Sequence, residues 1–144
     1  MLGEFCAVSR ETIAEPVIAV TAWQMPFEYG NAKPNRTVMS LGAGGNVACA
    51  VQLTVNAGLQ VIGVVSSKAI EYVKSLGSQT VVNYRTSKFQ NAVRPVDLVL
   101  DTVGGETRER SYSVLKSGGV LVSDVSADLT PERPTSARYF STLR

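Results

Sequence analysis

From Thr37 onward, short runs of β-branched and other apolar residues alternate with stretches that have helical spacing. This alternation is typical of a parallel sheet, because each connection between parallel strands must cross the sheet and usually does so as a helix. The expected strands are 37–41, 61–65, 81–82, 98–100, 120–122 and 139–143. The expected helices are 46–57, 69–76, 87–92 and 106–115. The sequence therefore predicts an α/β fold built on a doubly wound parallel sheet of about six strands.

The first 36 residues do not follow this rhythm. Residues 3–8 alternate as a strand does, and residues 21–29 have the composition of a helix with Trp23 and Phe27 available for packing. Gly58 and Gly77 follow two of the expected helices, where a glycine commonly ends a helix. We therefore expect the regular sheet to begin at Thr37 and the preceding residues to form a separate arrangement.

Composition excludes several classes of function. The 14 basic and 12 acidic residues leave a net charge of +2 without a basic cluster, so neither nucleic acid nor a membrane surface is an expected partner. No apolar run approaches the roughly 18 residues of a membrane helix, and no secretory signal is recognisable, so we expect a cytoplasmic protein. The chain contains no histidine and only Cys6 and Cys49. Histidine-dependent catalysis and the common zinc sites are therefore excluded, and no metal is expected.

A glycine-rich segment joins the first expected strand to the first expected helix. Glycine in such a loop permits a tight turn and a close approach of the backbone to a pyrophosphate, which the helix amides then face. Valine occupies the position of the third glycine in the usual fingerprint, so an ordinary strand-to-helix turn stays open as an alternative. The segment reads Gly42-Ala43-Gly44-Gly45-Asn46-Val47.

The end of the second expected strand bears on which nucleotide would bind. NAD-binding proteins and methyltransferases place an acidic residue there to hold ribose hydroxyls. This chain instead has Ser66, Ser67 and Lys68. Two hydroxyls and a cation suit a 2′-phosphate, which favours NADPH. The alternative from local sequence is a helix N-cap followed by a solvated lysine.

A series of short motifs, in order and at consistent spacing, extends over nearly all of residues 20–125. Together they resemble the cofactor-binding half of the medium-chain dehydrogenases/reductases, most closely the zinc-independent quinone oxidoreductase-like branch. The motifs are Thr21-Ala22-Trp23-Gln24, Lys33-Pro34, Gly42-Ala43-Gly44-Gly45, Ala50-Val51-Gln52-Leu53, Ser75-Leu76-Gly77, Val82-Asn83-Tyr84-Arg85, Asp101-Thr102-Val103-Gly104-Gly105-Glu106-Thr107 and Val114-Leu115-Lys116-Ser117-Gly118-Gly119.

The resemblance implies a Rossmann-type NADPH-binding domain of an enzyme that transfers hydride to a quinone, enone or related carbonyl substrate. A non-catalytic nucleotide-binding or structural module with the same fold is the alternative. No catalytic residue is predicted, because Tyr29, Tyr112 and Tyr139 lie in no motif that would identify a proton donor. The implied cofactor-binding residues are Thr21, Gly42, Gly44, Gly45, Asn46, Val47, Ser66, Ser67, Lys68, Tyr84, Thr102, Val103 and Gly104.

The resemblance also implies a division of the chain. Residues 1–20 are expected to be a remnant of a catalytic-domain strand with its linker, and residues 21–144 the NADP(H)-binding domain. We therefore expect a fragment of an oxidoreductase that turns over poorly in isolation, because one wall of the active-site cleft belongs to the catalytic domain. The relatives extend their sheet through the last strand, so residues 139–143 predict a homodimer.

Overall fold

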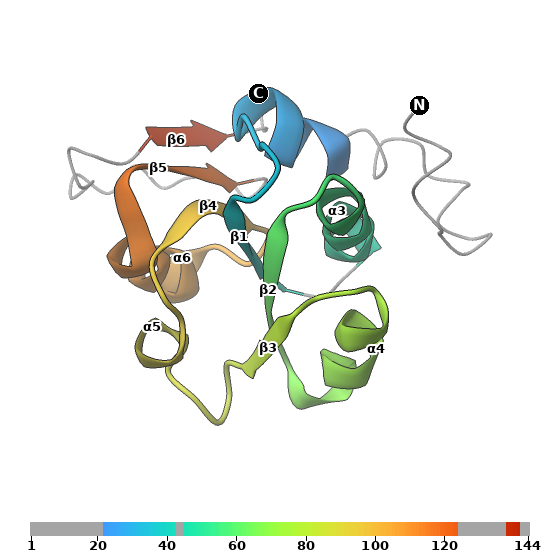
Figure 1. The fold of residues 1–144 in the computed structure, drawn as a ribbon. Coiled ribbons are helices and arrows are strands. Elements are labelled where there is room, and N and C mark those ends of the chain that lie inside the picture. Colours follow the sequence, from blue (N-terminus) through green and yellow to red (C-terminus); the bar gives the residue numbers. More distant parts are fainter. Residues whose placement is uncertain (1–21, 43–44, 124–137, 142–144) are drawn as a thin grey trace.

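The computed structural model describes residues 22–42, 45–123 and 138–141, with residues 45–47 and 138–141 described through their backbone alone. Its centre is a six-stranded sheet in the order β3-β2-β1-β4-β5-β6, in which every neighbouring pair is parallel (Figure 1). This order is that of the Rossmann fold. The predicted fold is therefore confirmed. The strands are β1 (Thr37–Leu41), β2 (Gln60–Val65), β3 (Thr80–Asn83), β4 (Val96–Asp101), β5 (Leu115–Ser123) and β6 (Arg138–Ser141).

Helices cover both faces of the sheet, as a doubly wound fold requires (Figure 1). On one face lie α3 (Gly45–Asn56) and α4 (Ile70–Ser75), the latter preceded by the 3₁₀ turn η3 (Ser67–Ala69). The other face carries α5 (Phe89–Ala92) and α6 (Gly105–Ser111), which continues into the 3₁₀ turn η4 (Tyr112–Val114). The longest described helix, α3, has 12 residues, and none of the described helices has the length and apolarity needed to span a membrane.

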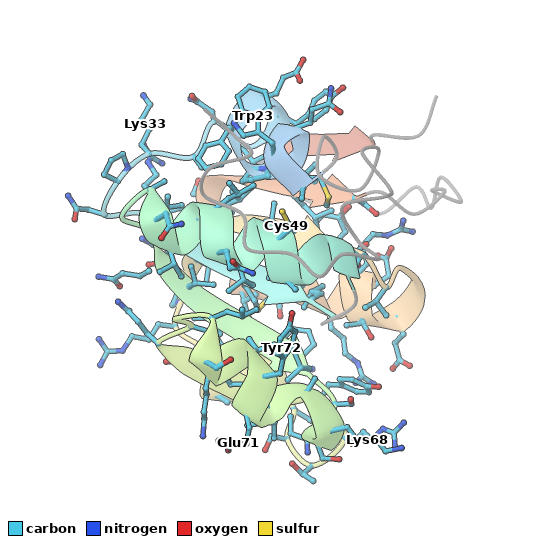
Figure 2. The ribbon with its side chains drawn as sticks, turned by 90° about the vertical axis from the view of Figure 1, so that its right-hand side faces the viewer. Trp23, Lys33, Cys49, Lys68, Glu71 and Tyr72 are labelled. Carbon is cyan, nitrogen blue, oxygen red and sulfur yellow. The ribbon has the colours of Figure 1, made fainter. Side chains whose placement is uncertain are left out.

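Both faces of the sheet are buried, which explains why the strand sequences are apolar almost without interruption. Val38 and Leu98 point towards α3, whereas Met39 and Leu121 point towards the side of α5. Cys49 on α3 is fully buried in the first of these clusters (Figure 2). Complete burial of a valine, leucine or methionine side chain in these clusters stabilises the fold by about 1.5–3 kcal/mol.

The helix predicted over residues 21–29 differs in its winding. Residue 21 lies outside the described residues, Ala22 and Trp23 are α-helical, and η2 (Gln24–Tyr29) is a π-helix. The Gly30 N–H donates to the Met25 carbonyl at 2.9 Å, five residues earlier, and the Ala32 N–H donates to the Pro26 carbonyl at 2.9 Å. The segment is therefore helical as predicted, with the wider winding of a π-helix.

The strand predicted over 120–122 is longer than expected, because β5 begins at Leu115. Val96 lies opposite Leu115, yet Leu98 lies opposite Val120, so the residues between them are accommodated by an irregularity in β5. Gly118 has φ +77° within this irregularity. The glycines at 118 and 119 precede the expected strand and are typical of a turn, but this turn lies within β5 instead of before it. The helix predicted to reach residue 115 ends earlier, since α6 stops at Ser111.

Candidate functional site

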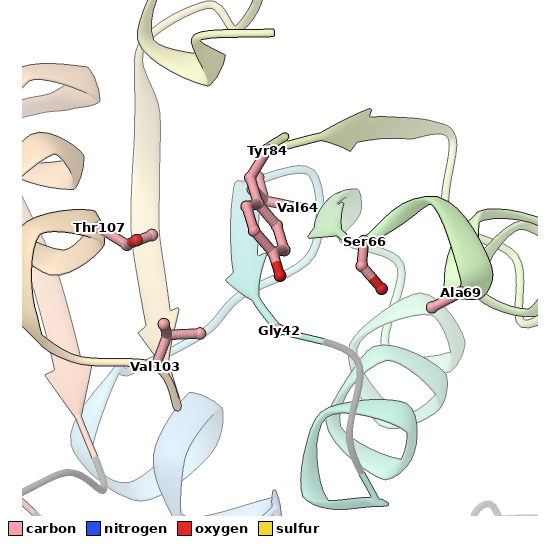
Figure 3. Close-up of a pocket in the computed structure, with 7 residues that line it drawn as sticks. All are labelled: Gly42, Val64, Ser66, Ala69, Tyr84, Val103 and Thr107. Carbon is pink, nitrogen blue, oxygen red and sulfur yellow. The ribbon is translucent and has the colours of Figure 1, made fainter. Parts of the chain in front are cut away.

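A pocket of about 320 Å³ lies at the edge of the sheet where the strands end. Its walls come from the carboxyl ends of β1, β2, β3 and β4 and from α6 (Figure 3). The order of strands reverses between β1 and β4, so the pocket occupies the switch point at which open α/β sheets bind their ligands. The lining residues are Gly42, Val64, Ser66, Ala69, Tyr84, Val103 and Thr107.

The glycine-rich loop begins at the floor of this pocket. Gly42 has φ +95°, and its N–H donates to the Val64 carbonyl at 2.8 Å, which turns the chain sharply at the end of β1. The helix α3 starts at Gly45, so its unpaired amides lie close after this turn and provide an anion-binding terminus. Asn46 and Val47 belong to the first turn of α3. Gly44 of the loop and Thr21, which was predicted to contact the cofactor from the helix before the sheet, lie outside the described residues.

Two hydroxyl groups are directed into the pocket. Ser66 occupies the N-cap position of η3, but its side chain makes no capping hydrogen bond, so its hydroxyl is available to a ligand (Figure 3). Tyr84 follows β3 and is 45% exposed, with its phenol extending over Gly42 and the Arg85 guanidinium 5.9 Å from its ring centroid. The sequence assigns Ser66, Ser67 and Lys68 to a 2′-phosphate, and the family resemblance adds Tyr84. The structure brings together two of these four residues, Ser66 and Tyr84, in one pocket.

Ser67 and Lys68, the other two, do not line the pocket. Both are exposed, and Figure 2 shows Lys68 at the outer surface where η3 begins. Ser66 thus takes the N-cap position that the alternative interpretation assigned to it, without the hydrogen bond that would use up its hydroxyl. A contact between Lys68 and a bound phosphate stays a prediction, because only its long side chain can bring the ammonium group to the pocket.

The loop after β4 forms the wall opposite Ser66. Val103 is half exposed and faces the pocket, as does Thr107 from α6 (Figure 3). Thr102 and Gly104, also predicted, do not line it. The Thr102 hydroxyl donates to the Leu41 carbonyl at 2.9 Å, and the Gly104 N–H donates to Asp101 Oδ1 at 2.9 Å. These two residues therefore hold the shape of the wall.

Asp101 and Thr107 were not predicted as site residues, although both lie in the motif that begins at Asp101 and ends at Thr107. Asp101 is fully buried at the end of β4, where a carboxylate in an otherwise apolar run is itself a signal of a specific role.

The pocket has no charged residue in its lining. Among the described residues no three His, Cys, Asp or Glu side chains gather in a way that could hold a metal ion. Tyr29 and Tyr112 pack against the two core clusters, and the side chain of Tyr139 lies outside the described residues.

Comparison with known proteins agrees with this architecture. The sequence model of a family described as "Zinc-binding dehydrogenase" matches residues 48–134, which is more than half of the chain. The chain belongs to this family. Membership confirms the resemblance to the medium-chain dehydrogenases/reductases that the motifs indicated, and it makes the chain a nicotinamide-dinucleotide-binding domain of an oxidoreductase family.

Individual relatives show how much of such a protein the chain represents. It is 35% identical over 128 residues to the synaptic vesicle membrane protein VAT-1 homolog of Danio rerio, covering 83% of this chain and 26% of that protein. The quinone oxidoreductase from Coxiella burnetii superposes with a TM-score of 0.77 at 29% identity, covering 88% of this chain and 41% of that one. The chain thus spans less than half the length of either relative.

A third relative was solved as a separate domain. The nucleotide-binding subdomain of the enoylreductase domain of PpsC from Mycobacterium tuberculosis has a TM-score of 0.75 at 27% identity. The match covers 87% of this chain and 78% of that one. The chain covers about three quarters of this subdomain but less than half of the longer relatives, which agrees with a chain that corresponds to the cofactor-binding domain.

Proposed function

We propose that this chain binds NADPH as the cofactor domain of an oxidoreductase that transfers hydride to a quinone, enone or related carbonyl substrate. The observation that carries the proposal is the pocket at the switch point, bordered by the glycine loop and by the ends of four strands. When bound, the nicotinamide supplies the hydride, and the protein contributes binding and orientation. The names of two relatives, a quinone oxidoreductase and an enoylreductase, support the substrate class.

The pyrophosphate is proposed to lie at the start of α3. Gly42 and Gly45 leave room for the backbone to approach it, and Asn46 and Val47 extend the first turn of α3. The family resemblance assigns Gly44 and Thr21, which lie outside the described residues, to the same cofactor. A dinucleotide held there crosses β1, with its adenosine half over β2 and its nicotinamide half over β4. The Thr102–Gly104 loop then borders the nicotinamide half.

The adenosine 2′-phosphate is proposed to lie among Ser66, Ser67, Lys68 and Tyr84. Ser66 and Tyr84 direct hydroxyl groups into the pocket, and no acidic side chain lines it to repel a phosphate. Lys68 supplies the positive charge from the surface. A hydrogen bond to a charged group contributes roughly 1.5–3 kcal/mol, and the exposure of Lys68 places its contribution at the lower end. NADPH is therefore expected to bind about tenfold more tightly than NADH.

Titration of NADPH and NADH into the wild-type chain and into Lys68→Ala tests this proposal. We expect Lys68→Ala to lose most of the NADPH preference while its NADH affinity stays unchanged, and raised salt should weaken the preference in the wild type alone. Lys74→Ala is the matched control, because Lys74 is an exposed lysine of α4 that already pairs with Glu71. Tighter binding of NADH by the wild type would reject the NADPH assignment.

A non-catalytic nucleotide-binding or structural module is the second candidate, because the lining of the pocket includes no charged side chain that could transfer a proton. Oxidation of NADPH in the presence of a panel of quinones separates the two. Quinone-dependent turnover at ordinary enzyme rates identifies an enzyme. Binding of NADPH without turnover identifies a module, or a domain that requires a separate catalytic partner.

We also propose a homodimer formed through β6. In the described sheet β6 pairs only with β5, which leaves its outer row of backbone groups available to a second copy. Light scattering of the purified chain over a range of concentrations tests this. A stable monomer at high micromolar concentration would count against the dimer.

A further inference from the structure

The side chain that closes β4 is a carboxylate with no contact to solvent. Asp101 is 0% exposed, and its hydrogen bonds go to neutral donors. Its Oδ1 accepts the backbone N–H groups of Val103 and Gly104 at 3.0 and 2.9 Å. Its Oδ2 accepts the hydroxyl of Ser123, the last residue of β5, at 2.9 Å. A buried carboxylate is costly unless its oxygens are bonded, so this arrangement is a specific one.

These hydrogen bonds hold the Thr102–Gly104 loop against the ends of β4 and β5. The carboxylate joins the backbone of the loop to β4 and, through Ser123, to β5. On the opposite side the Thr102 hydroxyl donates to the Leu41 carbonyl at 2.9 Å, which joins the loop to the end of β1. The loop is thus tied to the strands on both sides of the switch point.

The same bonds decide what the loop presents to a ligand. The amides of Val103 and Gly104 are both used by Asp101, so they are turned away from the pocket and the Val103 side chain is turned towards it. Gly104 has φ +73° and ψ −166°, a conformation that side-chain-bearing residues avoid. Without the carboxylate, nothing among these contacts would hold two successive amides in that orientation.

We propose that Asp101 is a positioning residue that fixes the Thr102–Gly104 loop as the wall for the nicotinamide half of the cofactor, with Ser123 as its partner. The inference rests on the proposed function, because it requires that a dinucleotide lies across the pocket. It goes further in dividing the site: Asp101 acts on the half over β4 and has no influence on the adenosine half over β2, which Ser66 and Tyr84 border.

A pair of ligands separates these two halves. NADPH occupies the whole site, whereas 2′,5′-ADP contains the phosphorylated adenosine half alone. For Asp101→Ala we expect the dissociation constant of NADPH to rise by about tenfold, the effect of one lost hydrogen bond to a charged group, and that of 2′,5′-ADP to change less than about twofold. Isothermal titration calorimetry on the full chain measures both constants.

The conservative variant distinguishes positioning from charge. In Asp101→Asn the side-chain carbonyl can still accept both loop amides, and the new NH₂ group can donate to the Ser123 oxygen. We expect this variant to bind NADPH within about threefold of the wild type. Ser123→Ala removes one anchor, so it is expected to weaken NADPH by about threefold without affecting 2′,5′-ADP.

Ser78→Ala is the matched control, because Ser78 is also a buried serine whose hydroxyl bonds two carbonyls, and it lies before β3 at the other edge of the sheet. It should change neither ligand. Equal weakening of both ligands by Asp101→Ala, or unchanged binding of both, would overturn the inference, as would an Asp101→Asn variant as weak as the alanine variant. If Asp101→Ala does not fold, the same ligand comparison on Ser123→Ala decides. A wild-type chain that binds neither ligand would reject the proposed function itself and this inference with it.

Discussion

The two edges of the sheet each hold a carboxylate at an end of β4, and they use it in opposite ways. At the amino edge, Asp97 accepts the Thr37 N–H at 3.0 Å and forms ion pairs with Lys116 at 3.3 Å and Arg36 at 3.8 Å. At the carboxyl edge, Asp101 is fully buried and bonds two amides and a serine hydroxyl. One carboxylate is neutralised by cations at the surface, and the other shapes a loop.

This difference shows how a single strand serves stability at one end and binding at the other. Asp97 on β4 bonds Thr37 on β1 and Lys116 on β5, so the oxygens of its carboxylate are already occupied by partners within the protein. The pocket at the other end has no charged side chain in its lining, and Ser66 and Tyr84 direct hydroxyl groups into it. Substitutions at the amino edge should therefore change unfolding, whereas substitutions at the carboxyl edge should change ligand binding as well.

The largest effect is expected for Gly104→Ala. A side chain at φ +73° and ψ −166° costs about 1–3 kcal/mol and shifts the loop that borders the pocket, so both stability and NADPH affinity should fall. Gly118→Ala is the control at the amino edge: Gly118 also has a positive φ, +77°, and an added Cβ would meet nothing within 4 Å. It should lower stability but leave NADPH binding unchanged. Urea unfolding and calorimetry measure the two quantities, and equal NADPH affinity in the two variants would break the comparison.

An intermediate effect is expected for Asp97→Asn. Burial by itself would raise the pKa of Asp97, but the Thr37 amide, the Lys116 ammonium and the Arg36 guanidinium together lower the pKa below its ordinary value of 3.8. The carboxylate therefore stabilises the fold above pH 3.8, and this contribution is lost as the pH falls through the lowered pKa.

At pH 7 we expect Asp97→Asn to lower the free energy of unfolding by about 1.5 kcal/mol, since the hydrogen bonds to a charged group become neutral ones. The difference from the wild type should shrink as the pH falls below 3.8. Urea titrations at a series of pH values measure it. A constant difference across that range would show that shape and not charge matters at this position, and a change in NADPH affinity would contradict the separation of the two edges.

The smallest effect is expected for Arg36→Ala. The Arg36 side chain is 54% exposed, and its Nη1 lies 3.8 Å from Asp97 Oδ1. Exposed pairs of this kind contribute less than about 1 kcal/mol. We expect a loss of a few tenths of a kcal/mol that disappears at 1 M salt, where such charges are screened. Urea unfolding at low and high salt measures the change. A loss as large as that of Asp97→Asn would show that Arg36, and not the Thr37 amide, is the principal partner of the carboxylate.

Much of the fold could be predicted because burial on both faces makes the strands of a parallel sheet read as apolar runs. The ends were less certain: β5 extends through the turn at Gly118, since an irregularity lets a strand continue where local sequence predicts a stop. The π-helical winding of Gln24–Tyr29 depends on which carbonyl the Gly30 amide finds, which local propensity does not specify.

The residues of the site were also predicted only in part. Gly42, Ser66, Tyr84 and Val103 were predicted and do meet in one pocket, because parallel strands bring their carboxyl ends to one edge. The role of Asp101 was not predicted, since its partner Ser123 is 22 residues away and becomes a neighbour only when β4 and β5 pair. Motifs locate residues that touch a ligand more readily than residues that hold those residues in place.

The central pairing of β1 with β4 also bears on the order of events in folding. β1, β2 and β3 can assemble through short helical connections, whereas Thr37 and Asp97, which meet across β1 and β4, are 60 positions apart in the chain. Long closures of this kind are slow, because their entropic cost precedes their contacts. The pocket has its second wall only once β4 has docked. A ligand that needs both walls can therefore bind only late in folding, after β4 has docked. Such a ligand should slow unfolding and leave the rate of folding unchanged.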